Sequence, residues 1–320
     1  MLPKQQDPAL KIYIAIGGWA FNDPGPTATT FSDLAASIPR QKVFMESLIS
    51  FMSTYGFDGL DLDWEHPVSS ERSGREVDYT NFSAFMTRLK KTLSASSKGL
   101  TVTLPASYWY LQHFDLEGLG KSVDWFNIMS YDLHGTWDQG NKWTGAYLNA
   151  HTNLTEIDAA LDLLWRNDVD PNKVVLGLAF YGRTFSTTSS TCNAPGCTYE
   201  SGAQTGRCSK EVGILMNSEI DEYVEKNSVT PVLYKKEAVK VVSWGNQWVA
   251  YDDEETLKMK SEYAQSLCLG GLMVWAITHD SKDAKYHTAL AKTANRKIIA
   301  MSATDGSAFS SEDVAQGQCM

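Results

Sequence analysis

The chain has 320 residues, of which 43% are hydrophobic, and this is enough for one large core. Its 28 basic and 38 acidic residues give a formal net charge of −10, which argues against nucleic acids and anionic membrane surfaces as partners. A neutral polymer such as a polysaccharide meets no such electrostatic conflict. Most of the 10 Trp, 14 Tyr and 12 Phe are interpreted as core residues, and several Trp are expected to lie flat under sugar rings.

The chain shows no run of about 18 apolar residues, so no membrane-spanning segment is expected, and the polar start at residues 1–7 is not a signal peptide. Three cysteines, Cys192, Cys197 and Cys208, lie in a stretch rich in Gly, Ser and Thr. They predict a small disulfide-stapled loop formed in an oxidising compartment, with the pairing left open. A zinc site is the alternative, but no His lies among the cysteines and their spacing is irregular. We therefore predict no metal and no other cofactor.

Short apolar runs alternate with segments of helical periodicity along the chain. The runs predict six strands, at residues 11–16, 57–64, 100–104, 125–131, 174–181 and 270–277. The helical segments are 40–55, 78–97 and 155–165, the last with Thr155 as its N-cap. This alternation is typical of an α/β fold with a parallel sheet, and the nearly continuous apolar strands indicate burial on both faces. A (β/α) barrel is favoured over an open sheet.

The alternation stops between residues 183 and 251, where several short strands and three cysteines occur together. We interpret this segment as a small α+β module inserted before the last barrel strand. Residues 1–182 and 252–302 are then the barrel domain, and residues 303–320, rich in Ser, Asp and Gly, are expected to be disordered.

The second predicted strand carries four carboxylates within eight residues: Asp58, Asp61, Asp63 and Glu65. Strand side chains alternate, so the last three carboxylates share one face, and two leucines and Trp64 share the other. Asp58 is out of phase and is expected to be structural. In a barrel the apolar face meets the helices, so the three acids point inward.

Pro67 follows this strand, so Glu65 is expected at the carboxyl-terminal mouth of the barrel, where barrel enzymes hold their active sites. Like charges this close raise at least one pKa and titrate as a unit, which keeps a carboxylic acid protonated for general acid catalysis. A solvated acidic loop would not explain the alternation with apolar residues. A calcium loop would carry Gly and Asn turns, which are absent.

The pattern Asp-x-x-Asp-x-Asp-x-Glu at residues 58–65 resembles the signature of glycoside hydrolase family 18, the chitinases. Four further segments, in the expected order, are similar to landmarks of that family: Ala15–Trp19 (with Ala where Ser is usual), Met129–Asp132, Tyr181–Arg183 and Trp275. Residues 17–26 and 130–138 are similar to secreted fungal chitinases of the killer-toxin-like subgroup. The resemblance runs from about residue 11 to about residue 290.

The resemblance implies substrate-assisted hydrolysis of chitin with retention of configuration. Glu65 would protonate the glycosidic oxygen, and the substrate's own N-acetyl oxygen would attack the anomeric carbon to form an oxazolinium ion. Asp63 would bind the acetamido N–H and Asp61 would share a proton with Asp63. Tyr131 would steer the acetamido oxygen.

Seven further residues are expected at the substrate by the same resemblance: Trp19, Met129, Asp132, Trp137, Tyr181, Arg183 and Trp275. Core packing is the alternative interpretation of the three tryptophans, and Met129 is expected only to pack beneath the site. The expected partner is chitin or N-acetylglucosamine oligomers, without nucleic acid, membrane or an obligate protein partner. The family and the cysteines indicate an extracellular protein.

The six predicted strands are fewer than the eight of a complete barrel. In the family the strand that ends in Gly17-Gly18-Trp19 is normally the third, so the resemblance implies that the first two βα units are absent. Truncation is the favoured interpretation, and closure of the sheet by another chain is the alternative. Impaired hydrolysis with retained chitin binding, a toxin subunit, and an endo-N-acetylglucosaminidase are the alternative functions.

Overall fold

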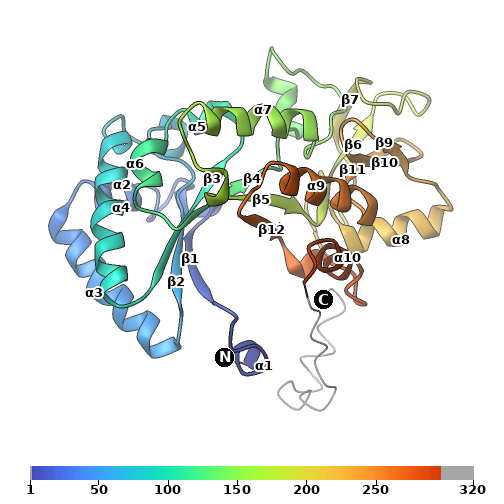
Figure 1. Cartoon of the computed structure of the whole chain (residues 1–320). Helices are drawn as coiled ribbons and strands as arrows, with labels where there is room; N and C mark the ends of the chain where they lie inside the picture. The colour runs from blue at the N-terminus through green and yellow to red at the C-terminus, as the bar shows by residue number, and fades with distance from the viewer. Residues whose placement is uncertain (1, 297–320) are drawn as a thin grey trace. The chain divides into compact units, whose positions relative to one another are not determined.

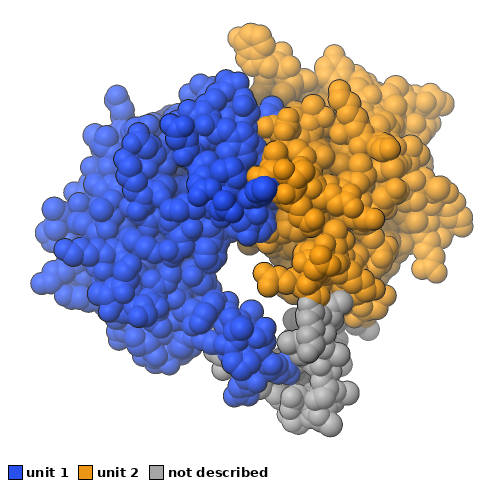
Figure 2. All heavy atoms as spheres, viewed as in Figure 1, with its two compact units in different colours: residues 1–129, 159–176, 268–271 blue, residues 130–158, 177–267, 272–320 orange. Residues whose placement is uncertain are grey.

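The computed structural model describes residues 2–296, which form two compact units (Figure 2). Among the described residues, unit 1 comprises residues 2–129, 159–176 and 268–271, and unit 2 comprises residues 130–158, 177–267 and 272–296. The predicted domain boundaries at residues 182 and 251 remain a prediction, and the predicted disordered tail lies outside the described residues.

One sheet has six strands in the order β1-β2-β3-β4-β5-β12 (Figure 1). These strands are β1 (Tyr13–Gly17), β2 (Gly59–Asp63), β3 (Gly99–Pro105), β4 (Trp125–Met129), β5 (Val174–Ala179) and β12 (Gly271–Trp275). The pairings from β1 to β5 are parallel, which confirms the predicted parallel sheet and its six strands. Within the described residues β1 and β12 are the two ends of this order, and the absence of two βα units remains a prediction.

The α-helices are α1 (Leu2–Gln6), α2 (Thr30–Ala35), α3 (Ile38–Tyr55), α4 (Asp78–Ala95), α5 (Tyr108–Leu111), α6 (Leu116–Gly120), α7 (Leu154–Trp165), α8 (Asn217–Asn227), α9 (Glu254–Ser266) and α10 (Lys285–Thr293). Gly56 ends α3 with a φ of 74°, a left-handed conformation that glycine adopts without a steric cost. The predicted N-cap Thr155 is wrong. Helix α7 begins at Leu154, and Asn153 accepts the hydrogen bond from the Thr155 N–H at 2.9 Å.

The apolar face of β2 packs against helices of unit 1. Leu60 and Leu62 are fully buried, and the Trp64 ring lies 5.4 Å from Phe31 in α2 and 5.1 Å from Phe82 in α4. Helices α2, α3, α4 and α6 cover this side of the first strands (Figure 1). The predicted alternation along β2 is therefore confirmed, because large apolar side chains on one face force the carboxylates to the other.

A second, antiparallel sheet lies in unit 2, with the order β7-β6-β11-β10-β9 and β8 paired to β6. Its strands are β6 (Tyr181–Thr187), β7 (Tyr199–Gly202), β8 (Ile214–Met216), β9 (Val232–Tyr234), β10 (Val239–Trp244) and β11 (Gln247–Tyr251). With α8 it forms the predicted α+β insertion. Its core surrounds the fully buried side chains of Trp248 and Phe185, whose ring centres are 5.7 Å apart.

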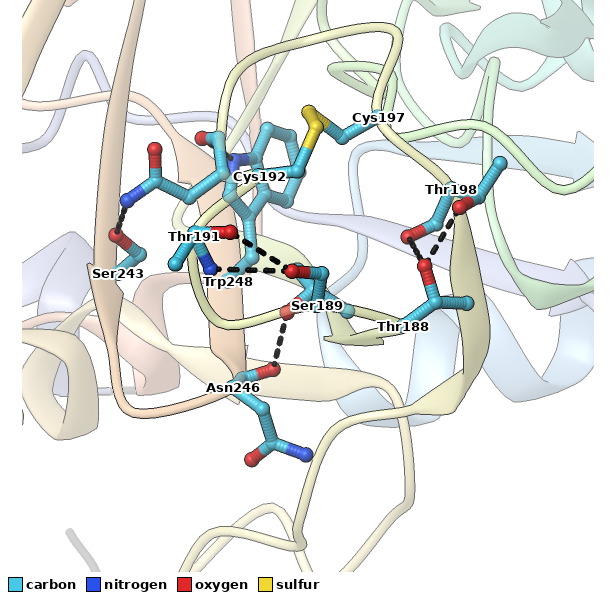
Figure 3. The surroundings of a disulfide bond; sticks show 11 residues. Thr188, Ser189, Thr191, Cys192, Cys197, Thr198, Ser243, Asn246 and Trp248 are labelled. Atoms are coloured by element: carbon cyan, nitrogen blue, oxygen red, sulfur yellow. Dashed lines mark hydrogen bonds between the residues drawn. A yellow bond between two sulfur atoms is a disulfide. The ribbon is translucent and has the colours of Figure 1, made fainter.

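Cys192 and Cys197 form a disulfide in the loop between β6 and β7 (Figure 3). The Asn193 carbonyl inside this loop accepts a hydrogen bond from the buried Trp248 indole at 2.9 Å, which ties the loop to β11. The predicted disulfide-stapled loop is thus confirmed for these two cysteines, whereas Cys268 is an exposed free thiol. In the described part of the chain, no group of three or more His, Cys, Asp or Glu side chains is placed to hold a metal ion, and no helix is long and apolar enough to cross a membrane.

Candidate active site

The carboxylate of Asp61 is held by three neutral hydrogen-bond donors from the neighbouring strands. The hydroxyls of Thr101 and Thr103 on β3 donate at 2.5 and 2.9 Å, and the Asn127 amide on β4 donates at 2.9 Å. These donors fix the orientation of Asp61 toward the face of the sheet that also carries Asp63. The side chain points away from the helices, as the alternation predicts.

Asp63, the last residue of β2, is half-buried, and one oxygen of its carboxyl is fully buried. Its Oδ1 atom has no hydrogen-bond partner among the described residues. Burial, and then the charges of Glu65 and Asp61, raise the pKa of Asp63 to about 8. Asp61 and Glu65, which strand alternation predicts on the same face as Asp63, are therefore coupled electrostatically to it. The proton shared directly by Asp61 and Asp63 remains a prediction, because the side-chain hydrogen bonds of Asp61 go to the three donors above.

Glu65 follows the end of β2 and is only 9% exposed. The His66 ring lies beside it, with Nε2 3.7 Å from Glu65 Oε2, and stacks on the Tyr110 ring at 4.1 Å. Burial lowers the pKa of His66 to about 3, and the positive charge of Arg72 acts in the same direction. His66 is thus neutral at physiological pH and places no imidazolium charge beside Glu65.

Arg72 is a site residue that sequence reasoning missed. Arg72 is 6% exposed. Its guanidinium donates from Nε to the Glu65 carbonyl at 3.1 Å and from Nη2 to the Trp19 carbonyl, and it pairs with Asp23 at 2.9 Å. Its Cζ lies 3.7 Å over the Trp19 ring, a favourable cation–π geometry. Trp19, in the short helix η1 (Trp19–Asn22), is 51% exposed. The detectable signal was an Arg in the Ser-rich loop just after the acidic strand.

The Gly17-Gly18 pair brings β1 against the acidic strand. A Cβ atom on Gly17, whose φ is 120°, would lie 1.8 Å from the Asp63 carbonyl oxygen, so only glycine fits there. The Gly18 N–H donates to the same carbonyl at 2.8 Å. The close approach places Trp19 beside the end of β2.

Asp132 and Arg183 form a bidentate ion pair in unit 2, with both N–O distances at 2.7 Å. The Asp132 N–H donates to His151 Nδ1 at 3.2 Å, and the other ring nitrogen lies 3.1 Å from the Tyr181 carbonyl. Burial alone would raise the pKa of Asp132, but hydrogen bonds with His151 and Arg183 and the Arg183 charge hold that pKa well below its usual range. Asp132 is therefore a fixed anion, and buried His151 was missed by sequence reasoning.

Three aromatic residues surround this ion pair. The Arg183 guanidinium lies 4.7 Å over the half-exposed Trp137 ring. The Tyr131 and Tyr181 rings meet edge to face at 6.2 Å, and the Tyr131 hydroxyl lies 3.9 Å from the Met273 sulfur. The structure thus brings together, within unit 2, five of the predicted residues: Tyr131, Asp132, Trp137, Tyr181 and Arg183.

Trp275 and Met129 end two strands of the first sheet. Trp275 is exposed at the end of β12, and its carbonyl accepts a hydrogen bond from the Phe180 N–H at 3.0 Å. Met129 ends β4 and is half-buried. Each of these two residues is therefore at the carboxyl end of its own strand, the end at which barrel enzymes hold their active sites.

His134 holds the segment that carries Trp137. Its ring nitrogens lie 2.7 Å from Asp138 and 2.9 Å from Glu156. Burial would lower the pKa of His134, but the hydrogen bonds to Asp138 and Glu156 outweigh it and raise this pKa to about 9. A buried imidazolium therefore fixes the short helix η3 (Thr136–Gly140). The i, i+4 spacing of His134 and Asp138 was the only sequence signal for this role.

A family model described as "Glycosyl hydrolases family 18" matches residues 1–280. The chain belongs to glycosyl hydrolase family 18. It is 31% identical over 301 residues to a probable chitinase, LysM11, of Penicillium expansum, with 85% of this chain and 27% of the relative covered. It is also 31% identical over 293 residues to chitotriosidase-1 of Mus musculus, with 87% of this chain and 60% of the relative covered. The chain thus spans about a quarter of the length of the fungal relative.

Solved structures of the family share the fold. The Group IV chitinase of Ostrinia furnacalis, in complex with allosamidin, superposes with a TM-score of 0.80 at 27% identity, covering 92% of this chain and 80% of that one. Catalytic domain 2 of the Group II chitinase of the same organism superposes with a TM-score of 0.81 at 24% identity, covering 93% and 81%. The half-barrel parallel sheet with its antiparallel insertion is therefore the family 18 chitinase fold.

Proposed function

We propose that this chain is a chitinase that hydrolyses β-1,4 linkages between N-acetylglucosamine units. The observation that carries the proposal is the Asp63 carboxyl near Glu65, which has a raised pKa and a buried, unused Oδ1 acceptor. A pKa of about 8 means that Asp63 holds a proton at neutral pH. A carboxylic acid at Glu65 and a buried acceptor on Asp63 suit a substrate with a glycosidic oxygen and an acetamido N–H.

The first step breaks the bond between the anomeric carbon and the glycosidic oxygen. Glu65 gives its proton to that oxygen while the carbonyl oxygen of the substrate's acetamido group bonds to the anomeric carbon. The product is an oxazolinium ion and a free leaving sugar. Asp63, which holds a proton at neutral pH, passes that proton to Asp61 as positive charge develops on the substrate. It then accepts a hydrogen bond from the acetamido N–H and stabilises the positive charge as an anion. An intramolecular nucleophile of this kind lowers the barrier by proximity.

The second step consumes the oxazolinium ion. Water attacks the anomeric carbon and gives a proton to the Glu65 carboxylate, and the carbon–oxygen bond to the acetamido group breaks with net retention of configuration. Tyr131 is assigned to orient the acetamido oxygen, and Asp132 to bind a hydroxyl of the distorted sugar. Trp19, Trp137 and Trp275 are assigned as stacking surfaces, which their exposure supports. Tyr181 and Arg183 are assigned contacts with the sugar, and Met129 packing beneath it.

Glu65→Gln tests the proposal, with release of N-acetylglucosamine oligomers from chitin as the measurement. Loss of the general acid should lower kcat by about 10²–10⁴-fold. Glu117→Gln is the matched control, because Glu117 is an exposed carboxylate on α6 that pairs with Lys121 at the surface. A fully deacetylated polymer should not be cleaved, since it lacks the nucleophile. Full activity of Glu65→Gln, or cleavage of the deacetylated polymer at an equal rate, would contradict the proposed mechanism.

We also propose that the protein is extracellular. A secreted chitinase, LysM12, of Penicillium expansum is 31% identical over 288 residues, covering 83% of this chain and 19% of the relative. The Cys192–Cys197 disulfide supports an oxidising compartment. Recovery of the protein from the medium with no free thiol at these two positions, measured by alkylation and mass spectrometry, tests this location.

A further inference from the structure

Two exposed tryptophans, Trp19 and Trp109, contact the loop that follows the acidic strand. Its short helix η2 (Ser70–Arg72) contains Arg72, which covers one face of Trp19, and Glu71, whose Oε1 accepts a hydrogen bond from the Trp109 indole N–H at 2.9 Å. Trp19 follows β1, η2 follows β2, and Trp109 follows β3. Since β2 pairs with both β1 and β3, the two tryptophans flank the end of the acidic strand.

Trp109 is an apolar ring that is held in place but not covered. It is 62% exposed, while its only polar side-chain atom is occupied by Glu71. The faces of the indole are therefore open to a ligand, and its orientation is already set, which reduces the entropy lost on binding. Tyr108, its neighbour on α5, instead lines a hollow with Tyr79 and Leu111, and Trp109 is not among the residues that line it.

The hydrogen bond to Trp109 is charge-assisted. It is the largest influence on Glu71 and lowers the pKa of that carboxyl, and the nearby positive charge of Arg72 acts in the same direction. Glu71 is consequently an anion at neutral pH, and hydrogen bonds to ionised acceptors are stronger than neutral ones.

Two routes connect Trp109 to the proposed acid. In the first, Glu71 precedes Arg72, which donates to the Glu65 carbonyl at 3.1 Å. In the second, Tyr110, the residue after Trp109, stacks on His66, whose Nε2 lies 3.7 Å from Glu65 Oε2. A ring fixed to the acid by both routes keeps a constant distance from the bond to be cleaved.

We propose that Trp109 is an additional sugar-binding residue, which stacks on an N-acetylglucosamine unit of the chitin chain away from the bond cleaved at Glu65. Glu71 is the residue that positions it. The apolar face of a pyranose ring complements an open indole face, and a neutral sugar adds no charge conflict beside Glu71. This inference rests on the proposed function, because the ligand is the same chitin chain.

Isothermal titration calorimetry on the Glu65→Gln protein, which holds oligomers without cleaving them, tests the inference. The probes are the trimer and the hexamer of N-acetylglucosamine. Adding Trp109→Ala should weaken hexamer binding about tenfold, equivalent to about 1.4 kcal/mol, and leave trimer binding within twofold. Trp109→Phe should keep most of the affinity. Glu71→Ala should lose about threefold with the hexamer, whereas Glu71→Gln, which retains an acceptor, should lose less.

Tyr55→Ala is the control variant, because Tyr55 is a similarly exposed aromatic residue at the end of α3, which leads to the amino end of β2. It should leave both affinities unchanged. Unchanged hexamer binding in Trp109→Ala, or an equal loss with trimer and hexamer, would overturn the assignment of Trp109 alone. If the Glu65→Gln protein binds neither oligomer and the wild type cleaves none, the proposed function and this inference fail together.

Discussion

Replacing Arg72 by Met should damage both the stability and the activity of the chain. The buried guanidinium donates hydrogen bonds to the Glu65 and Trp19 carbonyls, and it lies over the Trp19 ring. Methionine fills part of the volume but donates no hydrogen bond, so two carbonyls lose their charged donor and the indole loses its cationic cover.

The magnitude follows from these contacts. Each hydrogen bond from a charged donor contributes about 1.5–3 kcal/mol, and a partly exposed cation–π contact about 1 kcal/mol. The pair with Asp23 adds little, because that carboxylate is half exposed. The desolvation of the buried guanidinium offsets part of the total. We expect the free energy of unfolding to fall by about 2–4 kcal/mol.

Activity should respond more specifically than stability. Arg72→Lys keeps the charge but loses the planar fork and the stacking, so it should recover part of the stability and little of kcat/KM. Denaturant unfolding and oligomer hydrolysis, measured on the same preparations, separate the two effects. Arg75→Met is the matched control, because Arg75 lies in the same loop but is exposed and pairs with Asp33 at the surface, so it should change stability by less than about 0.5 kcal/mol. If Arg72→Met matched Arg75→Met in both measurements, the assigned role of Arg72 would be wrong.

Three further predictions concern buried charges. Lys260→Met should lower the free energy of unfolding by about 3–5 kcal/mol in denaturant titrations. Lys260 forms a fully buried pair with Asp252 at 2.5 Å, and the substitution leaves that carboxylate buried without its cation. Lys258→Met, at an exposed position, should have almost no effect, and equal effects of the two substitutions would contradict this prediction. His134→Gln should cost most stability below pH 6.5, by up to about 3 kcal/mol, because the His134 pKa of about 9 lies above its unfolded value and the stabilisation is lost as the pH rises toward 9; a pH-independent difference would argue against a buried imidazolium. Asp63→Asn should raise the melting temperature more at pH 8 than at pH 4. A carboxyl with a pKa of about 8 in the folded state destabilises the fold once the pH exceeds the pKa of the same group in the unfolded chain. The kcat/KM of the wild type should also fall above about pH 8, and a flat kcat/KM profile up to pH 10 would refute this.

Sequence reasoning was most successful where the signal was periodic and local. The alternation along β2 predicted which carboxylates share a face, since strand geometry alone determines it. Apolar runs predicted the six strands for the same reason. The error at Thr155 was also local: Asn153 and Thr155 are both suitable N-caps, and the pattern of apolar residues does not distinguish helix starts two residues apart.

The acidic strand itself, with its spacing of Asp58, Asp61, Asp63 and Glu65, was readable from the sequence alone. What surrounds it was not, because the partners are distant along the chain. Asn127 lies 66 residues from Asp61, and Arg72 lies 53 residues from Trp19. Only the tertiary structure brings them together, and burial is the largest of the causes that raise the pKa of Asp63. The sequence of one short strand determines which carboxylates are present. Their pKa values and orientations depend on packing between segments that are distant along the chain, and no local sequence pattern relates those segments.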